Sequence, residues 1–221
     1  SIVAAVAAAC LGACGGGGVG PWKKARELRV LTRNLYLGAD LTPVIGAVAG
    51  GDPDAIVLAT TDAFAQVVAT DFPVRAEALA AEIDAVRPDL VGLQEAALWR
   101  VQAPSDAFTM APTPATTVAY DFVALLRAAL AARGLDYVVV ASMDESDVEL
   151  PALDASLELQ DVRFTDRDVL LARADLAARG IALANPSAGL FATYVDLGGG
   201  LVVPRGWVAV DATFAGTTVR V

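Results

Sequence analysis

The sequence of 221 residues contains no histidine and only two cysteines, Cys10 and Cys14. Without histidine, the chain has no imidazole base, no Ser-His-Asp triad and no histidine metal site. Basic residues are also scarce, with 16 Lys and Arg against 26 Asp and Glu, which gives a net charge of −10. This balance argues against a protein that binds nucleic acid by charge alone, because phosphate contacts come from Lys and Arg.

Aromatic residues make up only 6% of the chain, and no run of Lys or Arg carries interleaved aromatic residues. A basic groove that stacks single-stranded bases is therefore not expected. A nuclease is not excluded, since a bound divalent cation can bring phosphate to an acidic cleft. With 56% apolar and 19% charged residues, the composition is that of a folded domain with a sizeable core.

Residues 1–27 have the pattern of a targeting segment and a linker. The apolar run from Ile2 to Ala9 is too short to span a bilayer and fits the core of a signal peptide. Leu11 to Cys14 resembles a bacterial lipobox, and four glycines follow it as a flexible tether. We expect acylation of Cys14 and a membrane-anchored lipoprotein at the periplasmic or extracellular face. The alternative is an apolar helix packed on the domain.

Helical periodicity and capping signals predict helices early in the chain, and alternating apolar residues predict strands late. We expect a loop beside the cleft over 101–116 and an irregular acidic segment over 143–155. The order of elements favours an α/β sandwich of two mixed sheets with outer helices. The predicted helices are 43–49, 53–69, 72–86 and 120–132, and the predicted strands are 28–34, 89–94, 137–141, 157–163, 167–173, 190–196, 206–213 and 216–221.

Two of the predicted strands end in a polar side chain. Leu28 to Asn34 ends in an asparagine, and Leu90 to Gln94 is followed by Glu95. Chemistry in α/β sheets gathers at the carboxyl ends of strands, and amide and carboxylate oxygens suit Mg²⁺ or Ca²⁺. The plainer alternatives are a solvated loop glutamate and a turn asparagine that bonds its own backbone.

Four segments resemble the endonuclease/exonuclease/phosphatase superfamily, the DNase I-like metal-dependent phosphoesterases. Arg-Pro-Asp-Leu-Val-Gly-Leu-Gln-Glu over 87–95 is the most specific of them. The others are Leu-Arg-Val-Leu-Thr-Arg-Asn-Leu over 28–35, Thr-Asp-Arg-Asp-Val-Leu-Leu-Ala-Arg over 165–173 and Arg-Gly-Trp-Val-Ala-Val-Asp over 205–211, in the family's order. The resemblance implies a DNase I-like sandwich over residues 28–221.

The resemblance also implies site residues and a cofactor. Glu95 would be the main ligand of Mg²⁺, or of Ca²⁺ or Mn²⁺, and Asn34 the second ligand or a group that orients phosphate. An acid near Asp166 supports the catalytic histidine in such enzymes; Asp168 is the neighbouring candidate, and an ion pair at the strand entry is the alternative. The substrate would be a phosphodiester, either a nucleic acid or a phospholipid, and no oligomer is predicted.

Three later motifs of the family are absent: Asn-Thr-His, Asp-x-Asn and a terminal Asp-His pair. We therefore expect residues 28–221 to represent a domain truncated at the C-terminus and to be nearly inactive alone. The alternative function is a non-catalytic surface lipoprotein, a binding module that keeps the fold and has lost the chemistry.

Overall fold

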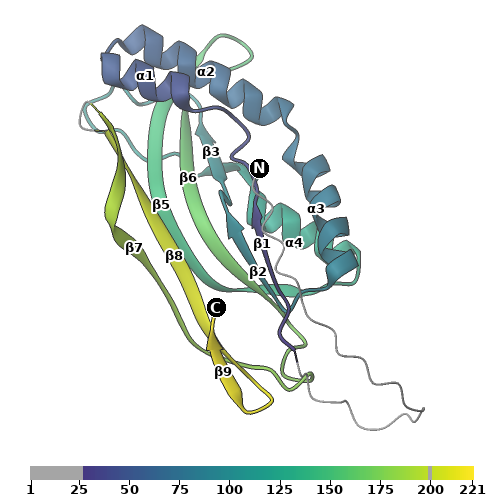
Figure 1. Ribbon diagram of the computed structural model, residues 1–221. Helices are drawn as coiled ribbons and strands as arrows, with labels where there is room; N and C mark the ends of the chain where they lie inside the picture. Colours follow the sequence, from purple (N-terminus) through teal and green to yellow (C-terminus); the bar gives the residue numbers. More distant parts are fainter. Residues whose placement is uncertain (1–26, 199–200) are drawn as a thin grey trace.

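The computed structural model describes residues 27–198 and 201–221. Two β-sheets face each other, and the helices pack against the first of them (Figure 1). This mixed α/β architecture confirms the predicted class of fold and is consistent with a DNase I-like sandwich. The predicted signal segment and Cys14 lie outside the described residues.

The first sheet has six strands, and its central strand is long. β6 (Leu159–Arg173) pairs with β5 (Tyr137–Leu153) along one edge. Along its other edge it pairs with β2 (Leu90–Gln94) and then β3 (Leu98–Gln102). β1 (Val30–Asn34) extends the sheet parallel to β2, and β4 (Thr117–Asp121) extends it antiparallel to β3, so the sheet is mixed as predicted.

The second sheet contains three described strands, in the order β7 (Ala182–Gly198), β8 (Leu201–Phe214) and β9 (Thr217–Arg220). All pairings in it are antiparallel, so the prediction of a second mixed sheet is wrong for the described residues. Buried Leu170 and Ala172 of β6 contact the same apolar cluster as Val210 and Ala212 of β8. This cluster joins the two sheets.

The four helices within the described residues match their predicted positions within a residue or two: α1 (Thr42–Gly50), α2 (Pro53–Ala69), α3 (Phe72–Val86) and α4 (Phe122–Ala132). Asp52 caps α2, because its side chain accepts a hydrogen bond from the Asp54 amide. Asp121 caps α4 by accepting from the amides of Val123 and Ala124. Among the described residues no single helix is long and apolar enough to cross a membrane, although α2 and α3, bent by 47° at their junction, satisfy that test as a pair.

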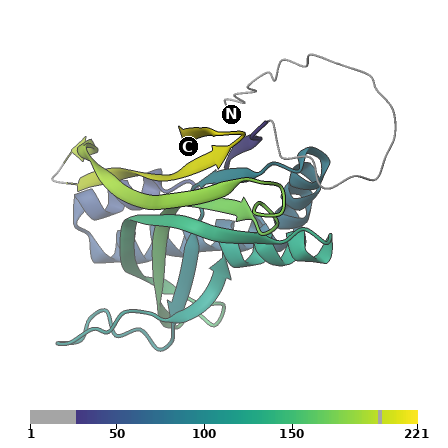
Figure 2. The ribbon, with the colours of Figure 1, turned by 90° about the horizontal axis from the view of Figure 1, so that it is seen from below.

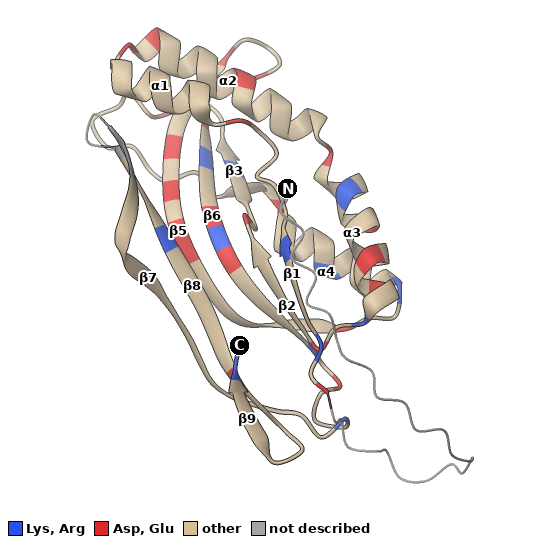
Figure 3. Cartoon of the chain, in the orientation of Figure 1, with Lys and Arg blue, Asp and Glu red and all other residues tan. Residues whose placement is uncertain are grey.

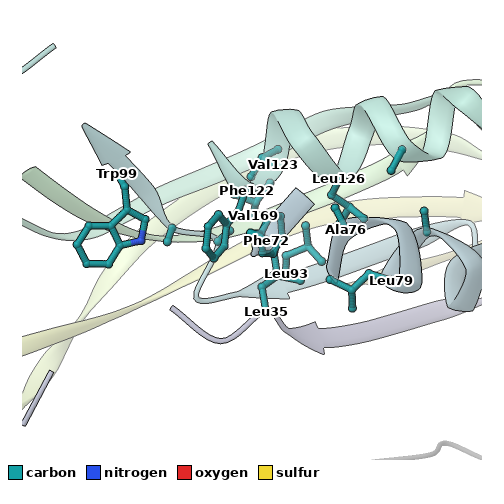
Figure 4. Packing of buried hydrophobic residues seen from close by; sticks show 14 of the residues in the cluster. Leu35, Phe72, Ala76, Leu79, Leu93, Trp99, Phe122, Val123, Leu126 and Val169 are labelled. Carbon is teal, nitrogen blue, oxygen red and sulfur yellow. The ribbon is translucent and has the colours of Figure 1, made fainter. Parts of the chain in front are cut away.

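The main core lies between the first sheet and helices α3 and α4 (Figure 4). Phe72 of α3 and Phe122 of α4 stack with ring centroids 3.6 Å apart, and both are fully buried against Leu93 of β2. Helices α1 and α2 instead cross the far end of the sandwich, at the top in Figure 1. There they cover the side of the sheet that faces β8.

Three predictions for the middle of the chain are wrong. Residues 143–155 are not irregular, since β5 continues through them to Leu153. The two strands predicted at 157–163 and 167–173 are one strand, β6. β3 and β4 were not predicted: β3 ends inside the segment assigned to the loop over 101–116, and β4 lies between that loop and the predicted helix, which it overlaps by two residues.

The predicted loop is real over 103–116, but it does not border the cleft. Asp161 anchors it by accepting hydrogen bonds from the Ser105 hydroxyl and the Asp106 amide, and Glu149 accepts one from the Ala115 amide. Neighbours of these two acids, such as Val162, line the main cavity, and successive strand side chains point to opposite faces. The loop therefore extends from the face turned away from the second sheet (Figure 2).

Candidate functional site

Asn34 and Glu95 meet at one edge of the first sheet. β1 and β2 are parallel, with Asn34 opposite Gln94, so both strands end at the same place. The Asn34 side-chain amide donates a hydrogen bond to Glu95 Oε1 at 2.7 Å. The structure thus brings together the two strand-end residues that the sequence singled out.

The backbone holds Glu95 in an uncommon conformation. Its φ of +54° lies in the left-handed region, which costs a non-glycine residue free energy. The Leu37 amide donates to Glu95 Oε2 at 3.0 Å, so both carboxylate oxygens are oriented. Asn34 Oδ1 accepts from the Tyr36 amide at 2.7 Å, as the turn interpretation predicted. The Asn34 amide group is therefore placed to orient Glu95, while its oxygen closes a local turn.

Arg167 fixes the segment that follows Glu95. Its guanidinium donates to the carbonyl of Ala96 at 2.8 Å and forms an ion pair with Asp121 at 2.6 Å. The Ala96 amide in turn donates to the Arg167 carbonyl at 2.9 Å. These contacts tie the end of β2 to β6 and to the start of α4, so Glu95 is held by regular structure on both sides.

Three acids from β5 and β6 lie between the sheets, and we call Glu145, Asp166 and Asp168 the carboxylate cluster. Figure 3 marks acidic residues along β5 and β6, with a basic residue on β8 beside them. Asp166 and Asp168 share one face of β6 because side chains alternate. Glu145 joins them through a β-bulge: Asp144 pairs with Arg167 and Ser146 pairs with Asp166, which leaves Glu145 without a partner.

β8 supplies the contacts that close the carboxylate cluster. Arg205 lies 3.4 Å from Glu145 Oε2 and 3.5 Å from Asp166 Oδ2. The Gly206 amide donates to Glu145 Oε1. A Cβ at Gly206 would lie 2.9 Å from Met143 Cγ and 3.1 Å from Glu145 Oε1, so only glycine lets the two sheets approach this closely.

Burial and negative charge in this space raise the pKa of two of its acids. Burial, and then the nearby Glu145 carboxylate, raise the pKa of Asp166 from 3.8 to about 6 against the opposing charge of Arg205. Burial and Glu145 raise the pKa of Asp168 to about 7. The charge of Glu95 also raises the pKa of Asp166, which links the carboxylate cluster to the strand-end pair.

A cavity of about 300 Å³ opens beside these charged groups. Glu95, Asp166 and Arg205 line it, together with apolar side chains from α1, α2, β5, β6 and β8. Asp166 is only 5% exposed, and its buried Oδ1 has no hydrogen-bond partner among the described residues. A buried carboxylate oxygen without a donor is a natural position for a cation.

A second group of acids lies on the opposite face of the sheet. The carboxylates of Asp106, Glu149 and Asp161 are close enough to hold a metal ion, the only such group of three among the residues that the structure describes. Both oxygens of Asp161 and one of Glu149 accept hydrogen bonds from the loop over 103–116. These contacts show that the group anchors that loop to the sheet. None of its three residues lines the main cavity.

Of the residues singled out from the sequence, Glu95 and Asp166 line one cavity, and Asn34 is hydrogen-bonded to Glu95. The structure adds Arg205, which lines the same cavity, and the neighbouring acids Glu145 and Asp168. Asp166 lies in the middle of β6 and pairs with Arg205 of β8, so it is not at a strand entry as the ion-pair alternative assumed, and the given sequence has no histidine for it to support. Asp168 could be found from its alternation with Asp166. Glu145 could not, because the bulge that turns it inward breaks the alternation of β5.

No family model matches the chain, and a search of curated proteins finds no sequence relative. Among solved structures, the chain is similar to an endonuclease/exonuclease/phosphatase family protein from Leptotrichia buccalis C-1013-b, with a TM-score of 0.41 and 9% sequence identity. The match covers 88% of this chain and 52% of that one, so this chain spans about half the length of its structural neighbour. The function is therefore argued from the geometry of the site.

Proposed function

We propose that this protein is a metal-dependent phosphoester hydrolase that acts on a phosphodiester, with Mg²⁺ or a similar divalent cation as cofactor. The observation that carries the proposal is the placement of Glu95. Its carboxylate is oriented by the Asn34 and Leu37 donors, at the shared end of two parallel strands, on the wall of a cavity. Such pre-organisation of an acid in a cavity is typical of a reaction site.

The donor groups fit a hard cation. Glu95 and Asp166 offer carboxylate oxygens to the same cavity, and one Asp166 oxygen is buried without a donor. Burial and the nearby Glu145 raise the pKa of Asp166 and of Asp168, and the single cation of Arg205 does not offset them. In this proposal Glu95 is the main ligand, with Asn34 or Asp166 beside it.

The bound cation would supply charge neutralisation on phosphate oxygens and a water of lowered pKa. The protein's own residues position the metal ligand and bind the phosphate. Asn34 and the Leu37 amide hold the Glu95 carboxylate in place, and Arg205, which lines the cavity and is about half exposed, donates to a phosphate oxygen. Asp166, which also lines the cavity, lies 3.5 Å from Arg205 and orients that guanidinium.

The test is hydrolysis of bis(p-nitrophenyl) phosphate by the full polypeptide that the gene encodes. We expect activity with Mg²⁺, none with a chelator, and a loss of about 100-fold or more in Glu95→Gln. Glu149→Gln is the matched control, since Glu149 belongs to the acidic group on the other face of the sheet. Activity that survives both the chelator and Glu95→Gln would refute the proposal.

The second candidate is a binding module without catalysis, and the absence of histidine from the sequence favours it. A binding module would keep its partner in the presence of a chelator and would hydrolyse no phosphodiester. Export and membrane anchoring through an acylated Cys14 remain part of the proposal. Loss of membrane association in Cys14→Ser, with the amount of protein unchanged, would support that part.

A further inference from the structure

The cavity beside Glu95 is polar at one end and apolar along the rest. The register of β5 and β6 orders its wall: Ser146 lies opposite Asp166, then Val148 opposite Phe164, then Leu150 opposite Val162. The polar pair lies next to Arg205, and the two apolar pairs lead away from it toward α1 and α2. Helix α1 closes the apolar part with aliphatic side chains, namely Val44, Ile45 and Val48.

The few polar atoms in the apolar part already have partners. Trp99 donates its indole N–H to the Leu37 carbonyl at 3.1 Å, and the Thr60 hydroxyl donates to the Ile56 carbonyl at 2.8 Å. A nucleobase placed there would lose its hydrogen bonds to water and find none in return, which makes the transfer unfavourable. An alkyl chain needs no such partners and gains free energy by leaving water.

We propose that the apolar part of this cavity binds the hydrocarbon chain of the substrate, so that the substrate class is a lipid-like phosphodiester and not a nucleic acid. The inference rests on the proposed function, because Glu95 and Arg205 must face the phosphate at the polar end. The volume of about 300 Å³ is at the lower limit of pockets that bind small molecules, and it suits one short stretch of chain.

The experiment compares two kinds of phosphodiester, one with an alkyl chain and one with nucleosides on the phosphate. Alkyl phosphocholines with chains of four to ten carbons, each below its micelle concentration, are titrated into the full polypeptide with Mg²⁺ by calorimetry. Thymidylyl-thymidine is titrated in parallel. We expect the dissociation constant to fall about fourfold per added methylene until the cavity is full, then to level off, because each buried methylene contributes about 0.8 kcal/mol.

Two valines of β5 provide a matched pair of variants. Val148 is 48% exposed and lines the cavity, whereas Val139 is 42% exposed and does not. Val148→Trp should fill the mouth of the cavity and weaken binding of the octyl compound by about tenfold or more, and Val139→Trp should leave it within about twofold of wild type. Both substitutions add the same side chain to the same strand, so a general effect on folding would appear in both.

A dissociation constant that does not depend on chain length, or equal weakening by the two tryptophan variants, would overturn the inference. Binding of thymidylyl-thymidine as tight as that of the octyl compound would also overturn it. Failure of the proposed function has a different signature, since alkyl binding would then be unchanged by a chelator and by Glu95→Gln while it still depended on chain length and on Val148.

Discussion

Raising the pH from about 4 to about 7 in the absence of divalent cations should destabilise this protein. Asp166 and Asp168 lie between the two sheets, where burial and Glu145 raise their pKa values from 3.8 to about 6 and about 7. Between the unfolded and folded pKa values, the folded state binds more protons than the unfolded state. The free energy of unfolding therefore falls as pH rises through this window and levels off above about pH 7.

The shifts set the size of this fall. The pKa of Asp166 rises by about two units and that of Asp168 by about three, and one unit corresponds to about 1.4 kcal/mol. The two shifts are not additive because both depend on the same Glu145, and solvent screens part of the shift of Asp168, which is only partly buried. We therefore expect a total of about 3 to 5 kcal/mol, below the simple sum. Acids with lowered pKa values, such as Asp147, act oppositely and cost stability only below about pH 4.

Urea unfolding at a series of pH values measures this dependence. Asp168→Asn should flatten the curve and make the protein more stable than wild type at pH 8 by about 2 kcal/mol or more. Asp62→Asn, an exposed position on α2, is the matched control and should follow the wild-type curve. A free energy of unfolding that is constant or rises between pH 4 and 7, or the same curve for both variants, would refute the reasoning.

Three further predictions concern other parts of the molecule. Asp121→Ala should lower the free energy of unfolding, measured in urea, by about 2 to 4 kcal/mol, because it removes the α4 cap and the ion-pair partner of Arg167. Asp52→Ala removes only the α2 cap and should cost about 1 kcal/mol, so equal losses in the two variants would contradict this prediction. Mg²⁺ binding should release protons from Asp166 and Asp168 and should become tighter from pH 5 to pH 8. Calorimetry in buffers of different ionisation enthalpy measures the proton release, and finding none would contradict the involvement of these two aspartates. Phe191 is 54% exposed on β7 among other exposed apolar side chains, so Phe191→Asp should reduce self-association in sedimentation velocity runs, and a wild-type protein that stays monomeric at all concentrations would contradict this.

The helices and the strand-end pair could be predicted because their signals are local. Asp52 followed by Pro53 marks the start of α2 within one residue, and Pro88 marks the end of α3. Asn34 and Glu95 each end a short apolar strand, and parallel pairing of those strands brings them together. These features depend on a few neighbouring residues, which the sequence shows directly.

The remainder of the site depends on contacts between distant strands. Acidic residues on β5, such as Asp147, suggested an irregular segment, yet Asp147 is paired with Arg163 across the sheet and the strand continues. Glu145 faces inward only because a bulge interrupts the alternation, and Arg205 reaches it from the second sheet. A sequence read in local windows does not show which strands pair or where a bulge lies.

Calorimetric titration of the full polypeptide with Mg²⁺ tests the central claim most directly, because two acidic groups lie on opposite faces of the first sheet. The account predicts that Glu95→Gln weakens Mg²⁺ binding by about tenfold or more, and that Glu149→Gln leaves it close to wild type. Binding that is unchanged in Glu95→Gln and lost in Glu149→Gln would place the cation at the loop over 103–116. That result would contradict the proposed site.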